Sequence, residues 1–230
     1  MTITLRAGAL NSGIQQNGTE FLTVDTSNNA TLSNNLTVTG GATLGAGAVL
    51  GTPTSGNLAN CTGYPASGLV GGALTSGTAV ATTSGTSIDF TSIPSWVKRI
   101  TVMFNGVSTN GTSVVLMQIG TSGGVEVSGY LGSCSTILGT APGANNFTTG
   151  WGVGADNIAA SVKHGFLTIA LLNTSSNLWA CSGVVGASNE ARASHTGGTK
   201  PLAATLDRVR ITTVNGTDTF DAGSINILYE

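Results

Sequence analysis

Hydrophobic and polar residues alternate along the C-terminal two thirds of this 230-residue chain. The clearest case is residues 99–106, where Ile100, Val102 and Phe104 are each followed by a more exposed type of residue, Thr, Met or Asn. Successive side chains of a strand point to opposite faces, so this alternation is typical of a half-buried strand. No long segment repeats apolar residues at helical spacing, and we therefore predict an all-β fold.

Strand patterns of this kind recur at regular intervals from about residue 84 onward. Two packed antiparallel sheets, a β-sandwich of jelly-roll type, would accommodate them. An Asn-Gly pair, Asn110-Gly111, predicts a hairpin between the second and third strands, and Asn215-Gly216 ends the seventh. Two long connections, Leu138–His164 and Gly186–Leu206, have the least regular pattern and are expected to be functional loops. The predicted strands are Ser87–Phe90, Arg99–Gly106, Ser113–Ile119, Ser128–Thr136, Gly165–Leu172, Leu178–Val185, Arg208–Val214 and Ser224–Tyr229.

The composition supports order without helices. Charged residues make up 8% of the chain, against about 25% in ordinary soluble domains, whereas 40% of residues are hydrophobic. The 34 glycines are about twice the usual share of ~7%. Glycine turns between strands rich in Thr and Val explain this balance better than disorder does.

Charge and hydropathy exclude several classes of partner. The net charge of -2 leaves no basic stripe for nucleic acid. No run approaches the ~18 apolar residues of a membrane span, and the N-terminus does not resemble a secretory signal, so we expect synthesis in the cytosol and no membrane insertion. Three widely spaced cysteines, Cys61, Cys134 and Cys181, form no metal-binding pair and are expected to be buried and reduced.

Three segments follow from the distribution of charge. Residues 1–25 carry a few charges and a short strand candidate at 21–24, and would attach the chain to a larger assembly. Residues 26–83 contain no charged side chain, and isolated Leu and Val residues recur among Gly, Asn, Ser and Thr. One chain could not bury enough apolar surface to order this tract, but three chains wound around one axis could, which predicts a trimeric stalk and neck. The alternative is a flexible linker.

The composition of the chain changes at Gly85–Val107, and this change marks the start of the third segment, a head domain of residues 84–230. Charges return there, and Pro94 is expected to form a corner. Trp96 would pin that corner to the core, and Trp179, on a predicted strand, is expected in the core.

Motifs for catalysis and cofactors are lacking. The chain has no phosphate-binding glycine loop and no GxSxG elbow. His164 and His195, its only histidines, lie in no metal-binding spacing, and its few carboxylates are more consistent with turns than with a glycosidase pair. We therefore predict no enzyme activity, no catalytic or metal-binding residues and no cofactor.

Two regions offer candidate contacts to a receptor or carbohydrate. Trp151 lies among glycines and polar residues, where an exposed indole would stack on a sugar ring, and Tyr130 is a second candidate. The segment Ser188–Lys200 concentrates hydrogen-bonding groups and adds Asn189, Glu190, Arg192 and His195. A solvated loop without a ligand is the alternative for this segment.

The chain resembles the C-terminal domains of bacteriophage tail fibres. The resemblance rests on GTSIDFTSIPSWVKRITVMFNGVSTNGTSVVLMQIG, on GGVEVSGYLGS and on the terminal AGSINILYE. The upstream LTVTGGATLGAGAVLGTPTSGNLANCTGYP is similar to the repetitive shafts that precede such domains. Tail fibres commonly have long N-terminal attachment domains, and from its length we expect none in this chain. The matching motifs carry no catalytic or metal-binding residue.

The resemblance implies a structural protein of the phage virion. The expected molecule is a homotrimer that docks on other tail or baseplate proteins through its N-terminus. Its heads would bind a polysaccharide or an outer-membrane receptor on the host surface, gaining strength from multivalency. Two alternatives stay open: a collar, shaft or decoration subunit that binds no receptor, and a small polysaccharide depolymerase.

Overall fold

The computed structural model describes residues 14–16, 19–24, 30–32 and 74–230. The chain divides into two compact units, Met1–Asn60 and Cys61–Glu230. Most of the predicted stalk and neck, residues 33–73, lies outside the described residues, as does Cys61.

The described part of the first unit is a small antiparallel sheet. Its strands are β1 (Ile14–Gln16), β2 (Thr19–Val24) and β3 (Ala30–Leu32), in the order β1-β2-β3. The strand predicted at residues 21–24 is confirmed as part of β2.

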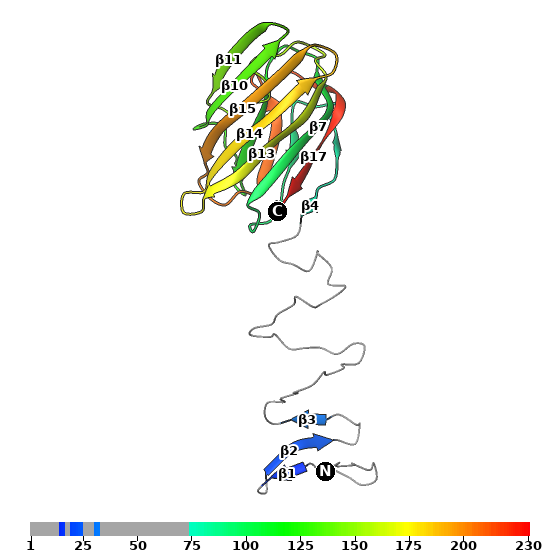
Figure 1. The fold of residues 1–230 in the computed structure, drawn as a ribbon, viewed down its shortest axis with the longest axis vertical. Helices are drawn as coiled ribbons and strands as arrows, with labels where there is room; N and C mark the ends of the chain where they lie inside the picture. Colours follow the sequence, from blue (N-terminus) through cyan, green and yellow to red (C-terminus); the bar gives the residue numbers. More distant parts are fainter. Residues whose placement is uncertain (1–13, 17–18, 25–29, 33–73) are drawn as a thin grey trace. The chain divides into compact units, whose positions relative to one another are not determined.

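The larger unit contains two antiparallel sheets and, over residues 74–230, no helix (Figure 1). The nine-stranded sheet has the order β11-β10-β15-β14-β13-β7-β17-β4, with β5 also paired to β17. Its strands are β4 (Thr75–Ser76), β5 (Val80–Ala81), β7 (Arg99–Thr109), β10 (Leu131–Leu138), β11 (Ala141–Phe147), β13 (Lys163–Asn173), β14 (Leu178–Ala187), β15 (Arg192–Pro201) and β17 (Phe220–Tyr229).

The five-stranded sheet has the order β12-β8-β16-β6, with β9 paired to β8. Its strands are β6 (Ile88–Phe90), β8 (Val115–Thr121), β9 (Gly124–Val125), β12 (Trp151–Gly152) and β16 (Arg208–Thr213).

One hydrophobic core joins the inner faces of the two sheets. Val102 and Leu167 of the nine-stranded sheet and Ile119 and Ile211 of the five-stranded sheet are all fully buried in it. The alternation seen in the sequence sets these positions, because successive strand residues face alternately inward and outward and the inward ones here are apolar. The prediction of an all-β fold with antiparallel sheets is confirmed.

All eight predicted strands are present, with ends that shift by four residues or fewer. The corner at Pro94 is also present, since Val97 N–H donates to the Pro94 carbonyl at 3.0 Å. Trp96 packs against the core and against Tyr229, with ring centroids 5.9 Å apart. Trp179 is buried in the core, as predicted.

The prediction that two long connections are loops is wrong. The segment Leu138–His164 contains β11 and β12, and Gly186–Leu206 contains β15. Strand β11 is an edge strand with six of its seven residues exposed, so no alternation of apolar and polar residues marks it. Strand β15 points polar side chains such as Ser194 and Thr196 inward, which hides the usual pattern.

The hairpin predicted at Asn110-Gly111 is also wrong, because β7 and β8 belong to different sheets. The connection crosses between the sheets and is held by the loop after β16. Thr219 N–H donates to Asn110 Oδ1 at 2.9 Å, and Ser113 N–H donates to the Asp218 carboxylate at 2.9 Å. Gly216, at φ 68°, turns the chain after β16, where Asn215-Gly216 was expected to end a strand.

Two short strands before residue 84 belong to this fold. Both β4 and β5 pair with β17, the last strand of the chain. Thr82 is fully buried, its N–H donates to the Gly223 carbonyl and its hydroxyl donates to the Ala222 carbonyl. The nine-stranded sheet therefore extends N-terminal to the head boundary predicted at residue 84.

Candidate functional site

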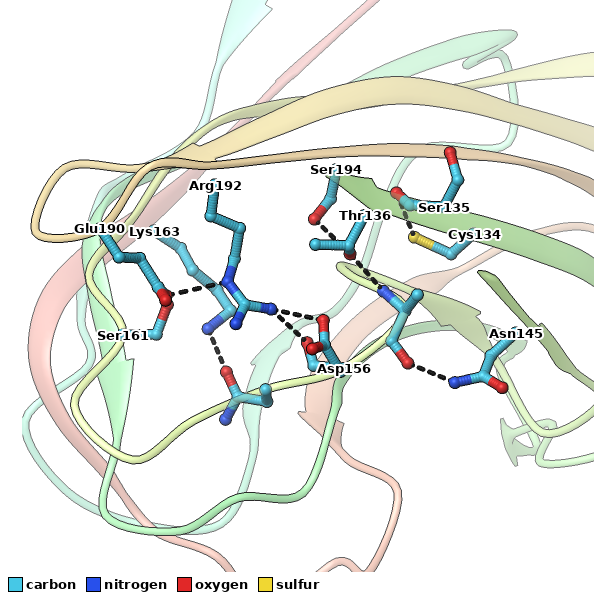
Figure 2. Close-up of polar contacts among 12 residues, drawn as sticks. Cys134, Ser135, Thr136, Asn145, Asp156, Ser161, Lys163, Glu190, Arg192 and Ser194 are labelled. Atoms are coloured by element: carbon cyan, nitrogen blue, oxygen red, sulfur yellow. Dashed lines mark hydrogen bonds and ion pairs between the residues drawn. The ribbon is translucent and has the colours of Figure 1, made fainter. Parts of the chain in front are cut away.

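A group of polar and charged side chains lies where β13 and β15 begin (Figure 2). They come from the loop after β12, from the turn between β14 and β15, and from the first residues of β13 and β15. Segments distant in sequence are thereby tied together inside the fold. We call this group the polar cluster: Asp156, Asn157, Ser161, Lys163, Glu190 and Arg192.

Arg192 is the centre of the polar cluster. Its side chain is 4% exposed, and Nη1 donates to the Asp156 carboxylate. Its Nε lies 2.9 Å from Oε1 of Glu190, which also accepts a hydrogen bond from the Ser161 hydroxyl at 2.6 Å. A buried guanidinium needs such partners, because removing one would leave an unpaired charge in a medium of low dielectric constant.

Lys163 is the second buried cation, and its ammonium group donates to Oδ1 of Asn157. Burial, together with the positive charge of Arg192, lowers the pKa of Lys163 to about 8. Asn157 in turn connects Lys163 to the segment after β7, since its amide donates to the carbonyls of Gly111 at 3.1 Å and Ser113 at 3.2 Å. The lysine thus fixes the crossing loop between β7 and β8.

A neutral set of hydrogen bonds extends the polar cluster along β10 and β15. The hydroxyls of Thr136 and Ser194 lie 2.9 Å apart, and Thr136 accepts the N–H of Ala155 at 2.8 Å. Asn145 of β11 donates to the Ala155 carbonyl. Figure 2 shows these residues as one continuous line of contacts.

The polar cluster stabilises the fold and offers little to a ligand. Two buried cations are balanced by two carboxylates, and of these only Asp156 is substantially exposed, at 55%. Nη2 of Arg192 is buried and has no hydrogen-bond partner within residues 74–230. We infer that Glu190 and Arg192, expected as receptor contacts in a loop, serve mainly to hold β15 to its neighbours.

The expectation of an exposed Trp151 is wrong. Its side chain is fully buried in β12, and Tyr130 is buried beside it. The two rings meet edge to face with centroids 5.0 Å apart. Two glycines provide the space, because a Cβ on Gly132 would lie 3.2 Å from the indole and one on Gly198 would lie 2.9 Å from it. Neither aromatic ring is available to a sugar.

The remaining two candidates lie apart from each other. Asn189 is exposed, but its amide bridges the backbone: Oδ1 accepts from Val162 N–H at 2.9 Å and Nδ2 donates to the Ala160 carbonyl at 2.8 Å. His195 lies on the outer face of the nine-stranded sheet, opposite Val184 of β14. The six predicted residues therefore form no single site.

A groove of about 390 Å³ lies on the outer face of the five-stranded sheet. Val127 and Val214 line it and are 57% and 53% exposed. Between them, hydroxyl and amide groups of two strands and three loops face the same space. The groove is lined by Thr86, Ser87, Leu116, Gln118, Val127, Thr149, Arg210, Thr212, Thr213, Val214, Asn215 and Gly216.

Arg210 is the charged side chain of the groove, and Asp89 neutralises it. Nε and Nη2 of Arg210 donate to the two carboxylate oxygens of Asp89 at 2.6 and 3.0 Å. This fork-to-fork pair raises the pKa of Arg210. Gln118 donates to the Thr149 carbonyl at 2.8 Å, which orients its amide in the groove. The arrangement suits a neutral ligand that exchanges hydrogen bonds.

Sequence reasoning missed the groove because its residues come from β8, β16 and four separate loops. The sequence of β8 nevertheless contains one sign that the outer face of this strand is covered. Residues 115–117 read Val-Leu-Met without alternation, and Leu116 is as buried as its inward-facing neighbours. Such a run shows that something covers the second face of the strand.

Within the described residues, no group of three or more His, Cys, Asp and Glu side chains is placed to hold a metal ion. The same part of the chain contains no helix with the length and apolar character to cross a membrane. Cys134 and Cys181 are buried and form no disulfide, as expected for them.

Comparisons with models of protein families, with curated proteins and with solved structures each found no match.

Proposed function

We propose that this chain is a phage tail-fibre protein of the virion, a homotrimer whose heads recognise the host cell surface. In this proposal the part of the predicted stalk and neck that precedes β4, residues 26–73, is trimeric, and the two-sheet unit, which includes β4 and β5, is a jelly-roll-like head. Residues 1–25 dock on other tail or baseplate proteins. The resemblance of the sequence to tail-fibre heads and shafts is the basis for these assignments.

The groove on the five-stranded sheet is the observation that best supports receptor recognition by the head. It is open, about 390 Å³ in volume, and lined by neutral hydrogen-bonding groups between two exposed valines. A site of this size holds one or two sugar rings. Arg210 lines the groove with its charge neutralised by Asp89, and the hydroxyl and amide groups beside it can exchange hydrogen bonds with sugar hydroxyls.

The lining also favours one class of sugar. No aromatic ring lines the groove, so stacking on a sugar face is absent there. Val127 and Val214 instead offer aliphatic contacts at its edge. We infer a neutral envelope polysaccharide whose sugars carry methyl groups, as deoxy sugars and N-acetylated sugars do.

Filling the groove tests the proposal. In the full chain, Thr149→Trp places an indole in the groove from an exposed position, and Thr148→Trp places the same group on the adjacent exposed residue outside it. Binding to arrayed envelope polysaccharides is measured for both variants and for the unmodified protein. We expect Thr149→Trp to lose binding at least tenfold and Thr148→Trp to keep it. Equal binding by both variants would exclude the groove.

A second candidate function is a virion subunit that binds no receptor. The outer face of the nine-stranded sheet favours it, because that face exposes Phe166 and Val184 and suits contact with protein. Failure of the unmodified protein to bind any host envelope preparation would support this alternative.

A further inference from the structure

The outer face of the nine-stranded sheet combines exposed apolar residues with small neutral ones. One register row runs across five strands through Ser135, His195, Val184, Phe166 and Met103. Phe166 is 55% exposed and Val184 is 47% exposed, and the two lie directly opposite each other on β13 and β14. A large aromatic side chain thus lies in the middle of an open sheet face.

This face carries almost no charge. Four register rows across β7, β13, β14, β15 and β10 contain a single charged residue, Arg99, at the corner, where it pairs with Glu230. A solvated surface of ordinary proteins is about 25–35% charged. The rows are Arg99, Ala170, Ala180, Thr199 and Leu131; Thr101, Thr168, Ser182, Gly197 and Ser133; Met103, Phe166, Val184, His195 and Ser135; and Asn105, His164, Gly186, Ala193 and Ile137.

The face is large enough for a stable interface. Five strands at a spacing of ~4.8 Å and four rows at a spacing of ~6.7 Å cover about 650 Å². One partner of a stable protein–protein interface contributes about 600–1,000 Å².

We propose that this face is the surface through which copies of this chain associate. The inference rests on the homotrimer of the proposed function and adds the surface that forms it. Around a three-fold axis, three such faces would turn toward one another, so that each copy of Phe166 approaches its symmetry mates.

Two observations favour a second copy as the occupant. A face with almost no charge can meet itself without desolvating an unpaired ion, whereas a charged partner would lose hydration here without gaining ion pairs. The chain also continues N-terminally from β4 and β5, which pair with β17 beside β7 in this same sheet. The uncharged tract at 26–73, which is the proposed trimeric stalk and neck, therefore continues directly into the sheet that presents the face.

Photo-crosslinking of the full chain tests the inference. Benzoylphenylalanine in place of Phe166 conserves an aromatic side chain, and the same residue in place of Ile158 is the control, since Ile158 is 47% exposed in a loop outside the face. We expect irradiation to join chains into dimers and trimers from position 166 and not from position 158. A trimeric protein that gives no crosslink between chains from position 166 would overturn the proposal.

A charge-insertion variant provides an independent measurement. Phe166→Arg with Val184→Lys alters two exposed residues, so the head is expected to keep its circular dichroism spectrum. The concentration at which trimers dissociate, followed by light scattering, should rise at least tenfold relative to Ile158→Arg. No rise would count against the interface. Glycan binding by the Thr149→Trp pair reports on the groove alone, so failure of one proposal is distinguishable from failure of the other.

Discussion

The hydroxyl of Tyr130 accepts the backbone N–H of Ile119 at 2.7 Å, deep in the core between the sheets. It also lies within hydrogen-bonding distance of the carbonyls of Ile119, at 3.2 Å, and Glu126, at 3.0 Å. Burial raises the pKa of this phenol, so it stays protonated and can donate. One side chain thus fastens the end of β8 to the segment that leads into β10.

Tyr130→Phe should destabilise the protein by about 1–3 kcal/mol. The substitution leaves the Ile119 N–H buried without a partner, and an unsatisfied buried donor costs about that much. Chemical denaturation measures the difference. Tyr229→Phe is the control, because the Tyr229 hydroxyl has no hydrogen bond recorded within residues 74–230 and its ring contact with Trp96 is retained. Equal losses in both variants would contradict this account.

Lys163 should make stability depend on pH in the alkaline range. Its pKa is about 8 in the folded chain and 10.5 for an ordinary lysine. Between these values the unfolded chain retains a proton that the folded chain has released, so the free energy of unfolding rises with pH, by up to about 3 kcal/mol. Below pH 8 the folded chain bears the full cost of the buried charge.

Comparison with Lys163→Met isolates this contribution. Burial also raises the pKa of Cys134, Cys181 and Tyr130, and these groups favour unfolding as pH rises above about 9. Their effect cancels in the difference between the two proteins. We expect any stability advantage of Lys163→Met at pH 7 to decline steadily toward pH 10. The exposed Lys98→Met is the control, and a parallel pH profile for all three proteins would refute the prediction.

Gly223 should tolerate no side chain. It has φ 94°, and a Cβ there would lie 2.3 Å from the carbonyl oxygen of Gly106, in the bulged pairing of β17 with β7. Gly223→Ala should cost more than about 3 kcal/mol, since backbone strain and overlap with backbone atoms add. Gly216→Ala has a similar φ of 68° but open space around the new Cβ, and should cost only about 1 kcal/mol. Denaturation midpoints compare the two variants, and similar costs would show that the overlap is relieved.

Removal of the two short strands before residue 84 should weaken the head. A protein of residues 84–230 lacks β4, β5 and the buried Thr82, and leaves the edge of β17 unpaired. Compared with Cys61–Glu230, it should lose about 3 kcal/mol, from several hydrogen bonds of about 1 kcal/mol each. Thermal unfolding of both proteins measures the loss. Equal stability would show that the head begins at residue 84.

Strands with an apolar inner face were predictable, and strands with a polar inner face were not. The alternation around Val102 places β7 within three residues of its actual end. Strand β15 instead points Arg192 and Lys200 inward, where they find Glu190, Asp156 and Glu126 as partners. Asp156 and Glu126 come from loops distant in the sequence, so no local pattern could reveal that these charges are buried.

The glycines next to Trp151 in the sequence led to the wrong prediction that its side chain is exposed. Glycines around an indole in the sequence indicate an exposed loop, but here Gly132 and Gly198 of neighbouring strands leave room for the ring. Sequence distance hides this relationship, since the three residues meet only after β10, β12 and β15 are in place. The groove escaped prediction for the same reason.

Strand β17 makes closure of the head depend on pairing between segments that are far apart in the sequence. It is synthesised more than a hundred residues after β4, β5 and β7, the strands with which it pairs. Until β17 has emerged from the ribosome, the edge of β7 stays open and its core residues lack Ile225 and Ile227. A nascent chain that has not yet reached β17 therefore cannot complete the nine-stranded sheet.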